Sequence, residues 1–406
     1  MKKWLFWAGL PFLWGSCSPA GTQAPRTGKW HAQLEVMDGR KLPFTFMLGK
    51  QEGTYRMEVF NAGEVVSIDE IRMERDSIHI YMPVFEGYIS ARSSGEELRG
   101  RFRIESLDRS VPFMARYGER PRFLVGPAPL VDLSGAWEVV FSPGTADEYP
   151  AKGIFRQEGD QLSGTFRTTT GDYRYLQGVV TGDSLKLSTF DGAHAFLFLA
   201  GMADSVMRGT FYSGNHFKEP FVGRRSPDYQ LPDARTLTYL KPGYDQLEFE
   251  FPGPDGALVS LRDQRFNRKA VVVQIMGTWC PNCLDETRFL TDYMALEDTA
   301  DLEVVALAFE YARTREAAFS RIRRLRERLG MEYPILLAQY GSSDKLLAQE
   351  KLPMLNQLIS YPTTLFIDKE KNVRAIHTGF NGPATGAPYE AFKRQFDSLV
   401  RVLQAE

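Results

Sequence analysis

The chain has 406 residues, a formal net charge of −2 and three cysteines. One hydrophobic core rarely serves a chain of this length, so two or three domains are expected. The near-neutral charge argues against a nucleic-acid-binding protein, which would need a basic face. A structural zinc site needs four ligands, and neither the three cysteines nor the five scattered histidines have the spacing of such a site.

The first 16 residues have the pattern of a secretory signal. Two lysines are followed by a short apolar run, and two small residues stand before Cys17. The run is far shorter than the ~20 residues that a membrane-spanning helix needs. The pattern resembles a bacterial lipoprotein signal, which implies a lipidated Cys17, a tether over 17–27 and, because no acidic residue follows, the outer membrane facing the periplasm. A free, unmodified Cys17 is the alternative.

The next 200 residues contain an internal repeat. Gly28-Lys-Trp30 recurs as Gly135-Ala-Trp137, and Leu98-Arg-Gly-Arg-Phe102 recurs as Met207-Arg-Gly-Thr-Phe211. Two further matches fall at nearly the same offset of about 107 residues, and a self-match at a fixed period indicates a duplicated unit.

Both copies alternate apolar and polar residues with the period of strands, as at 54–60 and 98–104. Roughly eight strand candidates per copy suit a small closed barrel. We therefore expect two antiparallel all-β repeats, 28–118 and 134–226, as barrels or sandwiches; a single fused sheet is the alternative. Their patterns resemble lipocalin-type or avidin-type meanders. Proline-rich segments at 119–133 and 227–244 are predicted linkers.

From residue 245 strands and helices alternate, which indicates an α/β fold with a largely parallel sheet. Arginines at 321–328 surround apolar residues at helical spacing, and a solvated helix face is the expected reason. The expected elements are a hairpin (247–251 and 257–261), strands at 271–276, 302–309, 333–338, 363–367 and 373–378, and helices at 282–296, 314–329, 343–358 and from Tyr389 onward.

Cys280 and Cys283 carry the strongest chemical signal. A buried strand leads through a Gly-Thr-Trp turn into a helix that begins at the first thiol. There the unpaired backbone amides and the helix dipole favour the thiolate of Cys280. A thiolate attacks disulfides, and a second thiol three residues later resolves the mixed disulfide. An inert or metal-binding pair is the alternative, although a bridge over so short a loop adds little stability.

Residues 245–406 resemble the thioredoxin-like thiol–disulfide oxidoreductases of the bacterial envelope, of the TlpA and ResA kind. The resemblance rests on the Asp255-Gly256 hairpin turn, the segments 277–283 and 361–368, the turn at 369–372 and the closing segment 379–386.

This resemblance implies a thioredoxin-like fold and a cis Pro362 that faces the dithiol. That proline would offer backbone groups to an extended substrate segment. Trp279, Tyr361 and Pro362 are therefore the predicted substrate-binding residues, with Trp279 packed over the thiol pair. A trans Pro362 at the start of an edge strand and an ordinary core role for Trp279 are the alternatives.

Glu286 is the predicted proton acceptor. Thioredoxin has a buried aspartate where this chain has Gln274, whereas the ResA-like relatives have a glutamate at the position of Glu286. At i, i+3 it shares a helix face with Cys283. Desolvation there would raise its pKa and let it take a proton from Cys283. An ordinary solvated glutamate is the alternative.

The sequence thus predicts a membrane-anchored disulfide reductase without a cofactor or bound metal. Its expected partners are disulfide-containing envelope proteins and a membrane or periplasmic thiol electron donor. Two alternatives remain. One is metal delivery by the cysteine pair with a distant histidine such as His377. The other is a binding role for the β repeats, with the redox part as an accessory.

Overall fold

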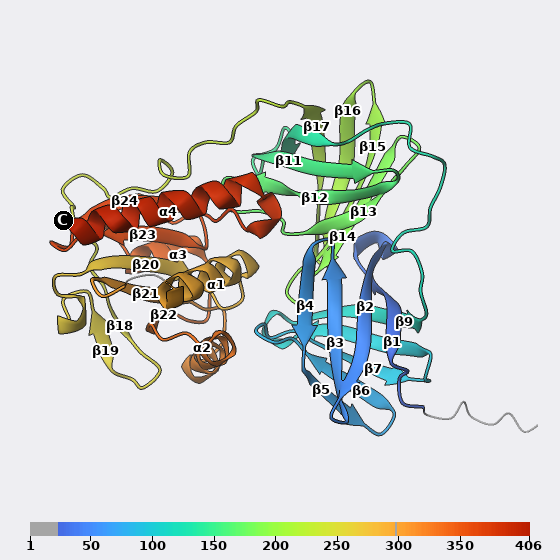
Figure 1. Cartoon of the computed structure of the whole chain (residues 1–406), viewed down its shortest axis with the longest axis horizontal. Coiled ribbons are helices and arrows are strands. Elements are labelled where there is room, and N and C mark those ends of the chain that lie inside the picture. Colours follow the sequence, from blue (N-terminus) through green and yellow to red (C-terminus); the bar gives the residue numbers. More distant parts are fainter. Residues whose placement is uncertain (1–22, 297–298) are drawn as a thin grey trace, which may run out of the picture.

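The computed structural model describes residues 23–296 and 299–406, which fold as two β units and an α/β domain beside them (Figure 1). The predicted signal segment and Cys17 lie outside the described residues. Within these two ranges, the helices are too short or too polar to span a bilayer.

The first β unit is an antiparallel sheet of nine strands in the order β4-β3-β2-β1-β9-β8-β7-β6-β5. The sheet curls until β5 approaches β3, but the two do not pair. Its strands are β1 (Gly28–Glu35), β2 (Lys41–Gln51), β3 (Thr54–Asn61), β4 (Glu64–Ile68), β5 (Glu70–Glu74), β6 (Ser77–Tyr81), β7 (Tyr88–Ser93), β8 (Glu97–Ile104) and β9 (Arg109–Tyr117).

The second β unit is a closed, up-and-down antiparallel barrel, because its first strand pairs with both its second and its last. Its interior is filled with phenylalanines; the rings of Phe166 and Phe198, for example, lie 4.8 Å apart. Its strands are β10 (Gly135–Phe141), β11 (Tyr149–Glu158), β12 (Gln161–Thr168), β13 (Leu176–Thr181), β14 (Ser184–Phe190), β15 (Ala195–Ala203), β16 (Val206–Ser213) and β17 (Phe217–Arg225).

The predicted duplication extends to side-chain detail. Trp30 and Trp137 are both buried, and each indole donates to the carbonyl four residues earlier, that of Arg26 (3.0 Å) and of Leu133 (2.9 Å). The expected eight strands are present in the second unit, whereas the first has β4 in addition. The tight turn after Asn61 pairs β4 with β3. β4 thus occupies the edge that would otherwise close the first barrel.

The two β units share a core where β14 lies against β2 and β3 (Figure 1). The rings of Phe44 and Phe190 stack with centroids 4.6 Å apart. Asn61 donates to the carbonyl of Phe190 (2.9 Å) and accepts from Arg122 (2.9 Å). Arg122 belongs to the predicted linker 119–133 and is buried, so this part of the linker is fixed between the two units.

The α/β domain contains a five-stranded sheet in the order β22-β21-β20-β23-β24. β20, β21 and β22 are parallel, whereas β23 pairs antiparallel with both β20 and β24. The sheet is therefore mixed, with β23 alone running against the other four strands. The short turn after β23 reverses the chain, and such a hairpin makes an antiparallel pair. The strands are β18 (Glu250–Pro252) and β19 (Leu258–Ser260) in the opening hairpin, then β20 (Ala270–Met276), β21 (Leu302–Phe309), β22 (Ile335–Gln339), β23 (Thr363–Ile367) and β24 (Val373–Thr378).

Four helices pack around this sheet: α1 (Pro281–Leu296), α2 (Arg315–Leu329), α3 (Lys345–Lys351) and α4 (Ala387–Ala405). α1 and α4 pack together, with Phe289 of α1 4.9 Å from Phe396 of α4 between ring centroids. α3 is much shorter than the predicted helix over 343–358. Pro353 follows it, and a proline disfavours helical backbone in the residue before it.

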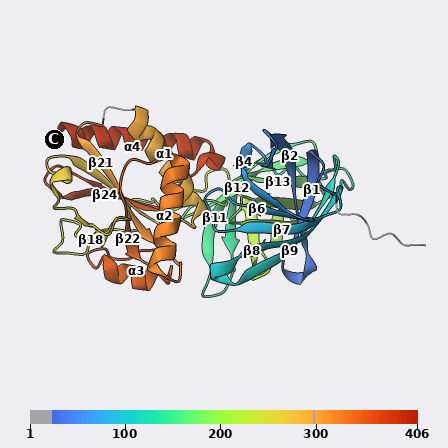
Figure 2. The ribbon, with the colours of Figure 1, turned by 90° about the horizontal axis from the view of Figure 1, so that it is seen from below.

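α2 lies on the side of the α/β domain that faces the β units (Figure 2). Arg323 and Arg326 are exposed, as the sequence predicts, but three other arginines of α2 pair with acidic residues of the first β unit. The pairs are Arg321–Glu86 (2.7 Å), Arg324–Glu70 (2.9 Å) and Arg328–Asp69 (2.8 Å).

The predicted linker 227–244 also contacts the α/β domain. The carbonyl of Ala234 accepts from the amide of Thr378 (3.0 Å), and that of Tyr239 accepts from the amide of Asn356 (2.9 Å). The position of the α/β domain beside the barrels is therefore held at several separate contacts.

Candidate active site

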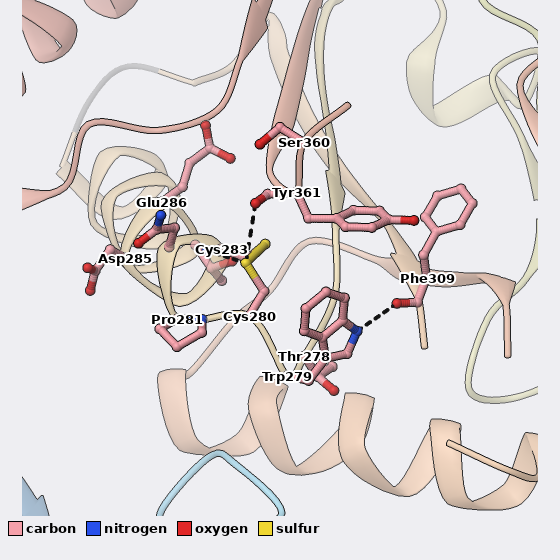
Figure 3. Close-up of a disulfide and its surroundings, with 12 residues drawn as sticks. Thr278, Trp279, Cys280, Pro281, Cys283, Asp285, Glu286, Phe309, Ser360 and Tyr361 are labelled. Atoms are coloured by element: carbon pink, nitrogen blue, oxygen red, sulfur yellow. Dashed lines mark hydrogen bonds between the residues drawn. A yellow bond between two sulfur atoms is a disulfide. The ribbon is translucent and has the colours of Figure 1, made fainter. Parts of the chain in front are cut away.

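Cys280 and Cys283 form a disulfide at the start of α1 (Figure 3). β20 ends at Met276, and the Gly-Thr-Trp turn brings Cys280 to the residue before the helix, where its carbonyl accepts from the amide of Leu284 (3.0 Å). The predicted position at a helix N-terminus is confirmed. Cys280 is 7% exposed and Cys283 is 0% exposed, so Cys280 is the more accessible residue of the pair.

The loop before β23 faces this disulfide. The peptide bond between Tyr361 and Pro362 is cis, as the resemblance implies, and the trans alternative is wrong. The carbonyl oxygen of Tyr361 lies 3.4 Å from Sγ of Cys280 (Figure 3). The backbone of this loop is therefore part of the immediate surroundings of the reactive sulfur.

Trp279 forms a fixed wall beside Cys280. Its indole Nε1 donates to the carbonyl of Phe309 (2.9 Å), and its ring lies 5.6 Å from the rings of both Tyr311 and Tyr361. The side chain is only partly buried. The structure thus places Trp279 and Tyr361 together next to the dithiol.

Glu286 is fully buried, so the alternative of a solvated helix residue is wrong. Burial raises the pKa of its carboxyl to about 7, although hydrogen bonds from Thr364 (2.7 Å) and Gln274 (2.8 Å) oppose the shift. These two side chains, rather than the sulfurs, are its hydrogen-bond partners. Glu286 lies one helical turn after Cys283 with a carboxyl that titrates near neutral pH.

Glu310 is a second buried acid that the sequence analysis missed. It follows β21 and accepts from both the amide (2.7 Å) and the hydroxyl (2.8 Å) of Thr278, in the turn before Cys280. Burial raises the pKa of its carboxyl to about 7, against those hydrogen bonds and the charge of Arg321. The sequence could have indicated Glu310, because β20 and β21 were both predicted. The carboxyl ends of neighbouring parallel strands meet at one edge of a sheet, so the residue after β21 is expected near the turn after β20.

A loop of the second barrel, residues 168–174, lies directly against the dithiol segment. Ser360, next to the cis peptide, donates to the carbonyl of Thr170 (2.7 Å). Asn282, between the two cysteines, donates to the carbonyl of Asp172 (3.1 Å). The barrel therefore contacts both chain segments that surround the reactive sulfur.

Arg174, at the end of this loop, connects the two β units and the α/β domain. Its guanidinium donates to the carbonyl of Pro281 (2.9 Å) and to the carboxylate of Asp285 (2.7 Å), and it pairs with Asp191 of its own barrel and Glu64 of the first β unit. Burial opposes the charge of Arg174, but the three carboxylates raise its pKa above the ordinary value. Burial in turn raises the pKa of Asp285 to about 6.

A cavity of about 460 Å³ lies between the second barrel and the dithiol, and Cys280 lines it. Tyr149, Tyr173 and Phe196 line it from the barrel, and Trp279 and Tyr361 from the α/β domain. Its volume lies within the range of about 300–1,000 Å³ that is usual for ligand sites.

The predicted metal alternative depended on His377. Its Nδ1 lies 3.0 Å from the carbonyl of Gly379, and its ring packs on Phe392. Over residues 23–296 and 299–406, no three His, Cys, Asp or Glu side chains are grouped so that they could hold a metal ion.

Comparison with known proteins places the α/β domain in a family. Residues 230–391 match the Redoxin family model. The fold and this match identify the C-terminal part as a thioredoxin-like Redoxin domain. No curated protein matches the chain.

Several solved structures are similar over part of the chain. A thioredoxin-family thiol:disulfide interchange protein from Chlorobium tepidum TLS is 19% identical, with a TM-score of 0.30, and the match covers 39% of this chain and 95% of that one. A DsbF homologue from Corynebacterium diphtheriae is 18% identical (TM-score 0.29; 43% and 96% covered). A thiol-disulfide oxidoreductase from Bacteroides fragilis is 13% identical (TM-score 0.27; 37% and 99% covered).

Proposed function

We propose that the protein is a disulfide reductase of the bacterial envelope that acts on protein disulfides. The observation that carries the proposal is the asymmetry of the cysteine pair: Cys280 is reachable at a helix N-terminus, and Cys283 is fully buried behind it. Such a pair suits attack by one sulfur and resolution by the other.

In the reduced protein, the Cys280 thiolate attacks one sulfur of the substrate disulfide. A bond forms between Sγ of Cys280 and that sulfur, the substrate S–S bond breaks, and the departing substrate thiolate takes up a proton. Cys283 then loses its proton and attacks Sγ of Cys280. The mixed disulfide breaks, the Cys280–Cys283 disulfide forms, and the second substrate sulfur leaves as a thiolate that takes up a proton. Two electrons pass to the substrate, and a thiol reductant restores the dithiol.

Glu286 is assigned as the acceptor of the proton that Cys283 loses. Support comes from its place one turn after Cys283 and from a pKa of about 7, which lets the carboxyl bind and release a proton near neutral pH. Glu310 holds the turn that precedes Cys280 and is assigned a positioning role.

The envelope location and the lipid anchor at Cys17 rest on the N-terminal sequence pattern. The proposed partners are disulfide-containing envelope proteins and a membrane or periplasmic thiol electron donor.

Insulin-disulfide reduction with dithiothreitol as electron donor tests the function. Cys280→Ser should lower the rate to that of dithiothreitol alone, because no attacking sulfur remains. Cys17→Ser, at the cysteine outside the pair, is the matched control and should retain the wild-type rate. A Cys280→Ser protein as active as the wild type would contradict the proposal.

A further inference from the structure

The cavity over Cys280 has walls from two separate bodies. The Redoxin domain supplies Trp279 and Tyr361, and the second barrel supplies Tyr149, Tyr173 and Phe196. With Cys280 only 7% exposed, a substrate that reaches its sulfur has to enter between these walls.

The barrel wall is closely fitted to the dithiol segment. A Cβ added at Gly171 would lie 2.0 Å from Nδ2 of Asn282, and one added at Gly379 would lie 2.7 Å from the backbone of Thr170. Only glycines permit so close an approach. Together with the buried ion pair between Arg174 and Asp285, these contacts fix the distance between barrel and dithiol.

Three residues that line the cavity have buried side-chain polar atoms without a hydrogen-bond partner. These atoms are Nδ1 of His194, which lies 3.3 Å from the carboxylate of Asp191, Oδ1 of Asn282, and the hydroxyl of Tyr361, a residue that is 7% exposed. Buried polar atoms are nearly always paired in folded proteins. These atoms have almost no accessible surface, so they are polar groups that the packing around the cavity leaves unpaired.

The charges around the cavity favour an uncharged occupant. Asp172 lines it, but its carboxylate accepts from the amide of Gly382 (2.7 Å). Lys345 also lines it and donates to the carbonyl of Ile359 (2.5 Å). Most of the remaining wall is aromatic or threonine.

We propose that the second barrel forms one wall of the substrate groove, and that this groove binds a flexible peptide segment whose cysteine is flanked by an aromatic or other apolar residue. The proposal rests on the proposed function and adds its substrate class. A disulfide held rigidly on a folded surface does not fit between the two walls, whereas an extended segment presents its sulfur to Cys280 and its flanking side chain to the barrel.

His194 allows a direct test, because its side chain is 30% exposed, lines the cavity and stacks on Phe196. His194→Trp should lower kcat/KM for a disulfide-linked peptide with Phe beside the cysteine by about tenfold or more, since the groove is narrowed. His79→Trp, at a histidine of the first β unit with 21% exposure, is the matched control and should match the wild type. Equal kcat/KM values for His194→Trp and His79→Trp would overturn the proposal.

A second peptide, with Asp in place of Phe, tests the chemistry of the wall. We expect the wild type to prefer the Phe peptide by about tenfold and His194→Trp to lose most of that preference. Equal rates of the wild type with both peptides would overturn the proposed substrate class. A wild type that reduces neither peptide nor insulin would instead contradict the proposed function.

A covalent trap keeps the proposal testable if His194→Trp does not fold. Cys283→Ser cannot resolve a mixed disulfide, so a peptide with a photoreactive benzoylphenylalanine beside its cysteine stays attached to Cys280. After irradiation, cross-links within residues 149–196 are expected. Cross-links confined to residues 245–406 would contradict the proposal that the second barrel forms a wall of the groove.

Discussion

Replacing Glu286 by Gln should change how stability depends on pH. In the folded protein the Glu286 carboxyl has a pKa of about 7, against 4.5 for an ordinary glutamate. The folded state therefore holds a proton that the unfolded state has lost between these two values. Stability consequently falls as the pH rises from 4.5 to 7 and stays at the lower level above that range. Gln carries no charge, so Glu286→Gln removes this decline.

The size of the effect follows from the two pKa values. Between pH 5 and pH 8 the variant should gain roughly 2–3 kcal/mol in unfolding free energy relative to the wild type. Asp285 and Glu310 have raised pKa values as well, but both proteins contain them, so their effects cancel in the comparison.

Urea-dependent hydrogen exchange at the amides of β20, on the oxidised proteins, measures this difference within the Redoxin domain. Parallel stability curves for wild type and variant across this pH range would refute the reasoning. In turnover, the same variant should slow resolution of the mixed disulfide by about tenfold to a hundredfold and lose the titration near pH 7. An unchanged pH profile would reduce Glu286 to a structural residue.

Three further outcomes are expected. Cys283→Ser should accumulate a mixed disulfide at Cys280, visible as added mass that dithiothreitol removes; no adduct would contradict the assigned roles. Arg174→Met leaves buried carboxylates without their cation, at a cost of about 3–5 kcal/mol. The variant should therefore be cleaved faster within 227–244 in limited proteolysis. Cleavage at the wild-type rate would refute the role of Arg174 in connecting the β units to the α/β domain. The Cys17→Ala protein should be absent from the membrane fraction or should keep its signal segment. A wild-type protein that is wholly soluble after export would refute lipidation.

The α/β part was predictable from local sequence because its signals are short-range. The predicted strands at 302–309, 363–367 and 373–378 have the observed bounds. Buried apolar runs and turn residues define such strands without knowledge of their partners. The helix start next to Cys280 was correct for the same reason, since strand, turn and helix are contiguous. The desolvation of Glu286 was instead inferred from the family resemblance.

The unpredicted features depend on residues that meet only in the folded chain. Whether a sheet closes into a barrel depends on which strands pair at its edges, and these strands meet only in the folded chain. The sequence therefore did not show that β4 prevents closure of the first unit. The paired arginines of α2 looked solvated because their partners, such as Glu70, lie some 250 residues earlier. Likewise Arg174 and Asp285 are 111 residues apart, and no local pattern placed a barrel loop over the dithiol.

The reduction potential of the Cys280–Cys283 couple tests the proposed reductase most directly. Equilibration of the full chain in thiol–disulfide buffers, with the oxidised fraction measured by thiol alkylation and mass spectrometry, gives this value. A reductase predicts a potential near that of thioredoxin, about −270 mV, whereas a value near −120 mV would mark an oxidant and contradict the account.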